Sequence, residues 1–223
     1  MPSNRSLCIL LTAAIFALLL SGNVSSAEER SDFTVVVLPD TQFYSQTYPE
    51  TYISQTRWIK DRAKADNIKF VVHLGDIVQN YNNAEEEWKA ADRAHQILDG
   101  VVPYSLVPGN HDMEYVDKKL LRNTRHYNKY YPPARFEDYS WYGGHLGDTN
   151  DNNYCFFEAA GMKFMVLGLE FAPRDETLEW AGQVVASHSD RRVIVVTHCY
   201  MRPNGRDKAC GASYGLADNS GQD

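Results

Sequence analysis

The sequence predicts an α/β fold with a largely parallel sheet. Short apolar runs rich in valine and isoleucine alternate with amphipathic stretches, and the links between them are short. Polar side chains follow these apolar runs directly, which is typical of the ligand-binding edge of an open sheet. With 43% hydrophobic and 23% charged residues among 223, the chain has a globular composition and is long enough to bury a sizeable core.

The N-terminal residues 1–27 have the pattern of a secretory signal peptide. Arg5 supplies the positive start, residues 7–20 form the apolar centre, and the small residues of a cleavage site precede Glu28. The apolar run is short for a membrane span, which takes roughly 20 residues. We therefore expect a secreted or periplasmic domain over residues 28–223, without a stable membrane span. An uncleaved N-terminal anchor is the alternative.

Three strands are expected in the first half of the mature chain. Residues 33–38 (FTVVVL), 68–74 (IKFVVHL) and 101–107 (VVPYSLV) are short, apolar and rich in β-branched side chains, as buried strands are. Their spacing leaves room for one helix between each pair. This order of strands and helices favours parallel pairing.

Two amphipathic helices are expected between these strands, over residues 52–65 and 84–98. Asn83 is placed to cap the second helix, and Glu86 falls at the capping-box position. The apolar faces consist of Ile53, Thr56, Ile59 and Ala63 in the first helix and of Trp88, Ala91 and Leu98 in the second.

The second half of the chain begins with an irregular segment. Residues 114–152 are rich in Tyr, Pro, Gly and Asn and lack a sustained period, which predicts a long surface insertion. This insertion either contributes to function or forms an aromatic-packed lid without a ligand role. A β-hairpin over residues 153–170, turning near 159–161, a helix over 177–189 and a strand over 192–198 complete the pattern.

Three cysteines remain after the signal peptide, namely Cys155, Cys199 and Cys210. Export permits disulfides, but an odd number excludes complete internal pairing. Cys199 and Cys210 bracket a short glycine-rich loop and form the favoured pair; three free thiols are the open alternative. The net charge of -7 argues against a protein that binds nucleic-acid backbones, which would usually be basic.

Polar side chains at four strand ends form the candidate site. They are Asp40, Asp76, Asn110, His111 and His198. Each alone is also typical of a turn, a helix cap or a packed histidine. Together they place carboxylate, amide and imidazole groups at one sheet edge, and these ligands suit Mn, Fe or Zn. Two such ions activate a water and clamp a phosphoryl group, so the set points to phosphoester hydrolysis.

The motifs around these residues resemble those of the calcineurin-like metallophosphoesterase family. PDTQ (39–42), HLGDIVQ (73–79), PGNHD (108–112) and VVTHC (195–199) occur in the family's order, and the resemblance covers about residues 33–200. The pair of GD after one strand and GNHD after the next is specific, whereas the other two motifs are weak alone. The resemblance implies a sandwich of two β-sheets flanked by helices.

The resemblance also implies a role for each site residue. Asp40 would bind the first of two divalent metal ions, Asp76 would bridge both, and Asn110 and His198 would bind the second. His111 would contact the phosphate and protonate the leaving group, a role that imidazole can perform near neutral pH. The expected activity is hydrolysis of a small phosphomonoester or phosphodiester. A non-catalytic or mononuclear protein that binds phosphate or a partner on the same fold is the alternative.

Three departures from the family pattern qualify this expectation. Gln42 stands where the family's first motif usually has a histidine, and Gln79 stands where many members have an aspartate that orients the catalytic histidine. Asp112 or a backbone group would then have to orient His111. The final Gly-His-x-His motif is absent, because no histidine follows His198. A chain that lacks its last strands explains this absence, and a natural degenerate member is the alternative.

Overall fold

The computed structural model describes residues 32–199 apart from 83 and 118, together with the strand segments 201–202 and 205–206. The expected signal peptide and the C-terminal tail lie outside the described residues. Within the described part, no helix is long and apolar enough to span a bilayer.

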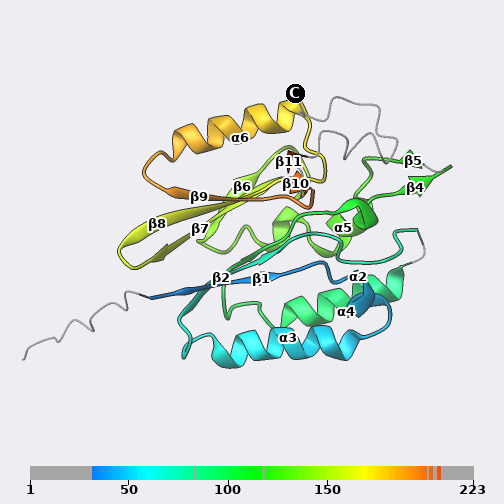
Figure 1. Ribbon diagram of the computed structural model, residues 1–223, viewed down its shortest axis with the longest axis horizontal. Coiled ribbons are helices and arrows are strands. Elements are labelled where there is room, and N and C mark those ends of the chain that lie inside the picture. Colours follow the sequence, from blue (N-terminus) through cyan, green and yellow to red (C-terminus); the bar gives the residue numbers. More distant parts are fainter. Residues whose placement is uncertain (1–31, 83, 118, 200, 203–204, 207–223) are drawn as a thin grey trace, which may run out of the picture. The chain divides into compact units, whose positions relative to one another are not determined.

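Two β-sheets face each other, and helices cover their outer faces (Figure 1). The first sheet contains, in order, the parallel strands β1 (Thr34–Leu38), β2 (Ile68–His73) and β3 (Tyr104–Ser105). The second contains, in order, β6 (Tyr142–His145), β7 (Asn153–Ala159), β8 (Met162–Gly168) and β9 (Arg192–Val196). The sandwich that the resemblance implied is therefore confirmed.

The expectation of a largely parallel sheet holds for the first sheet only. In the second sheet, β6, β7 and β8 are antiparallel, and only β9 runs parallel to its neighbour β8. The tight turn at Ala160 and Gly161, both with positive φ, joins β7 directly to β8 at the predicted place. A connection this short permits only antiparallel pairing.

The helices lie on the two outer faces of the sandwich. On the first sheet lie α3 (Pro49–Arg62) and α4 (Glu85–Gln96), with the short α2 (Gln42–Gln46), and on the second lies α6 (Asp175–Ser187) (Figure 1). The remaining short elements are η1 (Asn110–Asp112), β4 (Tyr115–Val116), β5 (Lys119–Leu120), α5 (Arg125–Tyr130), η2 (Pro133–Arg135), β10 (Met201–Arg202) and β11 (Gly205–Arg206).

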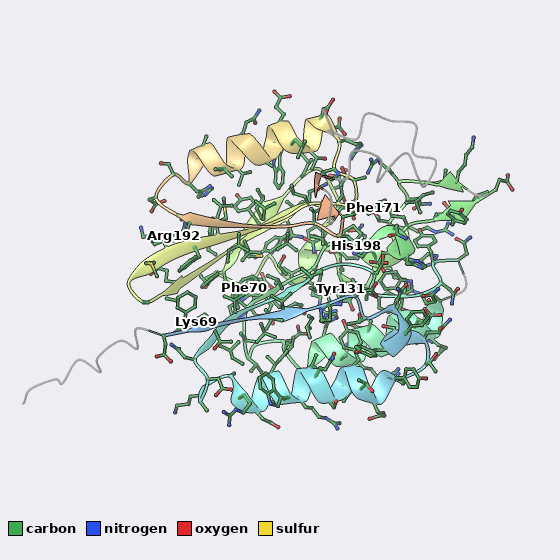
Figure 2. All side chains as sticks on the ribbon, in the orientation of Figure 1. Lys69, Phe70, Tyr131, Phe171, Arg192 and His198 are labelled. Carbon is green, nitrogen blue, oxygen red and sulfur yellow. The ribbon has the colours of Figure 1, made fainter. Side chains whose placement is uncertain are left out.

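Apolar side chains fill three layers, one between the sheets and one under the helices on each side. Phe70 of β2 lies between the sheets, where Figure 2 labels it, and its ring packs against Phe157 of β7 at 5.4 Å between centroids. On the first sheet's outer face, the predicted helix contacts Thr56, Ile59 and Trp88 are all buried. The helical periodicity in the sequence thus identified the buried faces of α3 and α4.

The predicted strand over residues 101–107 is wrong for most of its length, since only Tyr104 and Ser105 pair with β2. The residues before them complete the turns after α4, with the N–H groups of Val101 and Val102 both donating to Leu98 O. Pro103 has no N–H to give to a ladder. The apolar run 101–107 therefore has the composition of one strand, although its first residues belong to the turns after α4 and only two residues form β3.

The start of α4 differs from the predicted capping box, in which Asn83 caps the helix and Glu86 completes the box. Asn83 lies outside the described residues, and the N-cap position is Ala84, which makes no side-chain cap hydrogen bond. Glu86 pairs with Lys89 at 2.8 Å instead. Glu87 accepts the N–H of Gln79 at 2.7 Å, so this acidic first turn holds the loop that follows β2.

The segment 114–152 is not a surface insertion throughout. Tyr127, Tyr131 and Phe136 are at most 2% exposed and belong to the core beneath α3 and α4. The end of the segment forms β6, the edge strand of the second sheet. Its irregular pattern arises because aromatic residues from short helices and turns fill this layer. Among the described residues of this segment, the large exposed apolar side chains are those of Tyr115, Val116 and Leu121, in the β4–β5 hairpin and directly after it.

His95 of α4 lies fully buried in this aromatic layer. Its Nε2 is 3.0 Å from Tyr52 Oη and its Nδ1 is 2.8 Å from Tyr131 Oη. A neutral imidazole satisfies both hydroxyl groups, because one ring nitrogen donates and the other accepts. Burial is the main cause that holds the pKa of His95 well below its usual value, and the nearby His73 adds to it.

We expect His95 to make the fold sensitive to acid. In the unfolded chain, His95 takes up a proton below a pH of about 6.5, whereas in the folded chain it stays neutral. The free energy of unfolding therefore decreases as the pH falls below that value. Between pH 7 and pH 5, the wild type should lose about 2 kcal/mol more unfolding free energy than His95→Gln. Urea titrations at both pH values measure this difference, and equal losses would contradict it.

The described cysteines agree with the prediction that Cys199 is in a disulfide. Cys199 is disulfide-bonded, which excludes three free thiols. Cys210, the partner that the sequence favours, lies outside the described residues. Cys155 is free and buried in β7, where burial raises the pKa of its thiol.

Candidate active site

The loops that follow β1, β2 and β3 meet at one edge of the first sheet, and the loop after β9 reaches the same place. Thr41 N–H donates to Asp76 O at 3.1 Å, so the loops after β1 and β2 are joined through their backbones. His198 Nδ1–H donates to Leu74 O at 2.9 Å, which joins the second sheet to the end of β2. The predicted convergence of the strand ends is therefore present in the structure.

Asp76 lies at the centre of this edge and is only 3% exposed. Its Oδ2 is 3.1 Å from His198 Nε2, and its Oδ1 accepts the backbone N–H of His111 at 2.9 Å. Its φ of +50° is in the left-handed region, which aspartate and asparagine tolerate better than most residues. The carboxylate thus contacts residues from two of the other loops.

His198 presents its Nε2 to the Asp76 carboxylate because its Nδ1–H is held by Leu74 O. Burial lowers the pKa of His198, but the hydrogen bond and charge of Asp76 outweigh this and raise it. A proton on Nε2 satisfies both groups, and a bound cation would satisfy them equally. This is the usual arrangement of a ligating histidine, whose second nitrogen donates to a carbonyl.

Asp40 and Gln42 occupy the loop after β1. The Asp40 carboxylate accepts hydrogen bonds from Gln42 N at 3.1 Å and from Gln42 Nε2 at 3.0 Å. Partial burial and the charge of Asp76 raise the pKa of Asp40. The Oε1 atom of Gln42 is buried and has no hydrogen-bond partner among the described residues. This unpaired oxygen beside a carboxylate is suited to bind a cation.

His111 is oriented by a backbone group and not by Asp112. Its Nδ1–H donates to Gln79 O at 2.8 Å, so the residue that replaces the family's usual aspartate acts through its main chain. The other ring nitrogen, Nε2, is then available for a substrate. His111 and Asn110 both line a cavity of about 370 Å³. Within the described part of the chain, nothing hydrogen-bonds to the Asn110 side chain.

Asp112 instead ties two loops together, a role that the sequence did not reveal. Its carboxylate is fully buried and accepts the N–H groups of Gly109 at 2.8 Å, Ile77 at 2.9 Å and Val78 at 3.1 Å. Burial and the charge of Asp76 raise the pKa of Asp112, and the three N–H donors oppose that rise. The loops carrying Asp76 and His111 are thereby fixed to each other.

His73 joins the loops after β1 and β2. Its Nδ1 accepts Gly75 N–H at 3.1 Å, which leaves Nε2–H to donate to Thr41 Oγ1 at 2.9 Å. Burial is the main cause that lowers the pKa of His73 to about 3, so the ring stays neutral. The sequence signal for this role was a histidine directly after the apolar residues 70–72 at the end of β2.

The two loops also approach each other very closely at glycines. Gly75 has a φ of +91°, and a Cβ there would lie 2.9 Å from Gly109 N. A Cβ on Gly109 would overlap both the backbone N and the carboxylate of Asp76. The GD and GNHD motifs therefore contain glycine because their backbones are in direct contact.

Within the described residues, no group of three or more His, Cys, Asp and Glu side chains is arranged to hold a metal ion. Three of the predicted ligands are nevertheless adjacent, because the charges of Asp76 and His198 both affect the pKa of Asp40, and Asp76 contacts His198 directly. Two further candidate ligands, the side-chain amides of Asn110 and Gln42, are not among these four residue types. The donor chemistry therefore fits a divalent cation, with amides in place of some charged ligands.

Comparisons with known proteins agree with this arrangement. A family model described as calcineurin-like phosphoesterase matches residues 33–220. The uncharacterized protein YvnB of Bacillus subtilis (strain 168) is 35% identical over 180 residues, which make up 80% of this chain but only 14% of that relative. This chain thus spans a small part of the relative's length.

Two solved structures are also similar. A purple acid phosphatase from yellow lupin (Lupinus luteus) seeds has a TM-score of 0.50 and 14% identity, with 83% of this chain and 37% of that chain covered. A dimetal phosphatase from Danio rerio has a TM-score of 0.47 and 18% identity, with 82% of this chain and 75% of that chain covered. The first likeness shows a shared fold. Together with the family match, the motifs and their convergence identify this chain as a member of the calcineurin-like phosphoesterase family, whose members are hydrolases.

Proposed function

We propose that this protein is a metal-dependent phosphoesterase that hydrolyses a small phosphomonoester or phosphodiester. The main observation in favour of this proposal is the position of Asp76, whose two carboxylate oxygens contact His198 and the backbone of His111. A carboxylate shared in this way is suited to bridge two cations. Two divalent ions bound there would lower the pKa of a water and neutralise charge on the phosphoryl group.

The ligands divide between two positions. Asp40, with the unpaired Oε1 of Gln42 beside it, would hold the first ion, and Asp76 would contact both. Asn110 and His198 would hold the second, since the Asn110 side chain is unpaired within the described residues and His198 directs Nε2 toward Asp76. Oxygen and imidazole donors of this kind suit Mn, Fe or Zn.

His111 is the proposed general acid. Its Nδ1–H bond to Gln79 O fixes the ring, and its position on the cavity wall supports a role for Nε2 as donor to an ester bound in the cavity. A protonated Nε2 can give its proton to the leaving oxygen. The partner of His111 is thus the neutral carbonyl of Gln79 and not a charged carboxylate.

The test is hydrolysis of phosphomonoesters and phosphodiesters in the presence of Mn, Fe or Zn, together with the metal content of the protein. His111→Gln should lower kcat about 100-fold while metal content stays the same. Asp76→Asn should lower metal content, because it removes the bridging charge while asparagine tolerates the same φ. His188→Gln is the matched control, since His188 bonds to Val184 O at the end of α6.

The assay should include the 223-residue chain and the longer protein where the gene encodes one. Full activity of both Asp76→Asn and His111→Gln would refute the mechanism. Wild-type hydrolysis that persists after complete metal removal would refute the metal requirement.

A second candidate function is a non-catalytic or mononuclear protein that binds phosphate or a partner. The supporting observation is that the described residues contain no group of three charged or imidazole ligands arranged around one ion. Inductively coupled plasma mass spectrometry of the purified protein distinguishes the two candidates. Two tightly held ions per chain support the phosphoesterase, and one ion or none without hydrolysis supports the binding protein.

We also propose that the protein is secreted or periplasmic, on the strength of the signal-peptide pattern in residues 1–27. N-terminal sequencing of the protein exported by its own host should begin at Glu28. A protein that retains Met1 and stays in the cell fraction would contradict this.

A further inference from the structure

The cavity beside His111 has a composition that selects among phosphoesters. Its walls come from the loop after β2 and from the β4–β5 hairpin, which projects from the end of the sheets where β1 and α2 meet (Figure 1). Its volume of about 370 Å³ is near the lower end for small-molecule sites. The residues that line it include Gln79, Asn80, Tyr81, Asn82, Tyr115 and Leu120.

Three amides on the wall have fixed or unpaired oxygen atoms. Asn80 Nδ2 donates to Glu87 Oε1 at 2.8 Å, and Asn82 Nδ2 donates to Tyr115 O at 2.9 Å. Because a carboxylate and a carbonyl only accept, these amides cannot be reversed, and their Oδ1 atoms remain as acceptors. The buried Oε1 of Gln79 also has no partner among the described residues. The wall is thus suited to a ligand that brings O–H or N–H donors.

The rest of the wall is aromatic or apolar. Tyr81 and Leu120 are buried, whereas Tyr115 is 49% exposed on the hairpin. Among the described lining residues there is no carboxylate, ammonium or guanidinium group. The described wall therefore favours an uncharged leaving group, because a ring can stack on tyrosine and keep its hydroxyl groups on the amides.

We infer that the leaving group of the substrate is an uncharged, hydroxyl-bearing ring, such as the sugar of a sugar phosphate or the ribose of a nucleotide. This inference rests on the proposed function, because the cavity is adjacent to the proposed general acid. Sugar phosphates and nucleotides both contain a polyhydroxylated ring that carries a phosphoester. They differ in that only nucleotides carry a nucleobase.

The experiment compares kcat/KM for four phosphoesters with the metal-loaded protein. Glucose 6-phosphate, ribose 5-phosphate and adenosine 5′-monophosphate present such rings, and methyl phosphate presents none. At least one ring ester should exceed methyl phosphate by about tenfold or more, mainly through KM. A preference for adenosine 5′-monophosphate over ribose 5-phosphate identifies a nucleotide, and equal values identify the sugar as the recognised part.

Two variants test the wall itself. Gln79→Met removes the unpaired Oε1 without breaking a described side-chain hydrogen bond, so the variant should fold, and Tyr115→Ala removes the exposed ring. Each should reduce the ratio of ring ester to methyl phosphate about tenfold. Gln46→Met and Tyr48→Ala are the matched controls, because both residues are exposed and lie outside the cavity. Their ratios should equal that of the wild type.

Methyl phosphate hydrolysed as well as every ring ester, or a ratio unaffected by both wall variants, would overturn the inference. A failure of the proposed function appears differently, as the absence of hydrolysis with every ester. In that case saturation-transfer NMR with adenosine and methyl glucoside decides. Binding that weakens in Gln79→Met and Tyr115→Ala supports the ring-binding wall, and no binding of either probe overturns it.

Discussion

Replacing Asp112 with alanine is expected to destabilise the protein by roughly 3 kcal/mol or more and to remove the proposed phosphoesterase activity. The Asp112 carboxylate is fully buried and accepts three backbone N–H groups, those of Gly109, Ile77 and Val78. Alanine leaves these donors buried without partners, and each unsatisfied donor costs about 1 to 3 kcal/mol. The loops that carry Asp76 and His111 would also lose their common anchor.

Urea unfolding at pH 7.5 (about neutral, where histidine is largely uncharged) and a kcat measurement test this prediction together. Asp112→Asn is the informative second variant, because its single carbonyl oxygen retains part of the acceptor capacity, so its loss of stability should be smaller. Asp138→Ala, at an exposed position, controls for the removal of a carboxylate. An Asp112→Ala protein with wild-type stability and activity would show that the loops are held by other contacts.

Much of the fold follows from local patterns in the sequence. Strands β1 and β2 and helices α3 and α4 have the periodicities of buried elements, and each lies close to its predicted position. The prediction failed where an apolar run has two uses, as between Leu98 and Val107, where part of the run ends a helix. It failed again for Tyr127, Tyr131 and Phe136, because aromatic side chains in short irregular elements carry no period that marks them as buried.

The convergence of the candidate site's side chains was predictable, but their backbone contacts were not, and the catalytic and metal-binding roles of these residues stay predictions. Asp76, His111 and His198 are brought together as their positions after strands implied. The carbonyl of Gln79, which orients His111, could not be identified from residue types, because every residue has a carbonyl. Asp112 was missed as an anchor for the same reason, since its partners are backbone N–H groups, two of which belong to another loop.

Gly109→Ala is expected to disrupt the site more severely than its single methyl group implies. The added Cβ would overlap Asp76 N and the Asp76 carboxylate, and the backbone atom cannot move aside by a change of rotamer. The loops after β2 and β3 must therefore separate, which should destabilise the fold by about 1 to 3 kcal/mol, the usual range for overpacking.

Separation of these loops also lengthens the bond between His111 N–H and Asp76 Oδ1, which is 2.9 Å in the structure. Because misplacing reacting groups by about 1 Å costs about 100-fold in rate, kcat/KM should fall by at least that factor. If Asp76 and Asn110 bind the same metal ions, as proposed, metal content should fall as well, because the two side chains would move apart. Gly182→Ala is the matched control, because a Cβ there meets no atom within 4 Å and the position is in α6. Gly182→Ala should keep activity and metal and should stabilise the helix slightly. If Gly109→Ala retained wild-type metal content and kinetics, the close approach of the two loops would not be what positions the site.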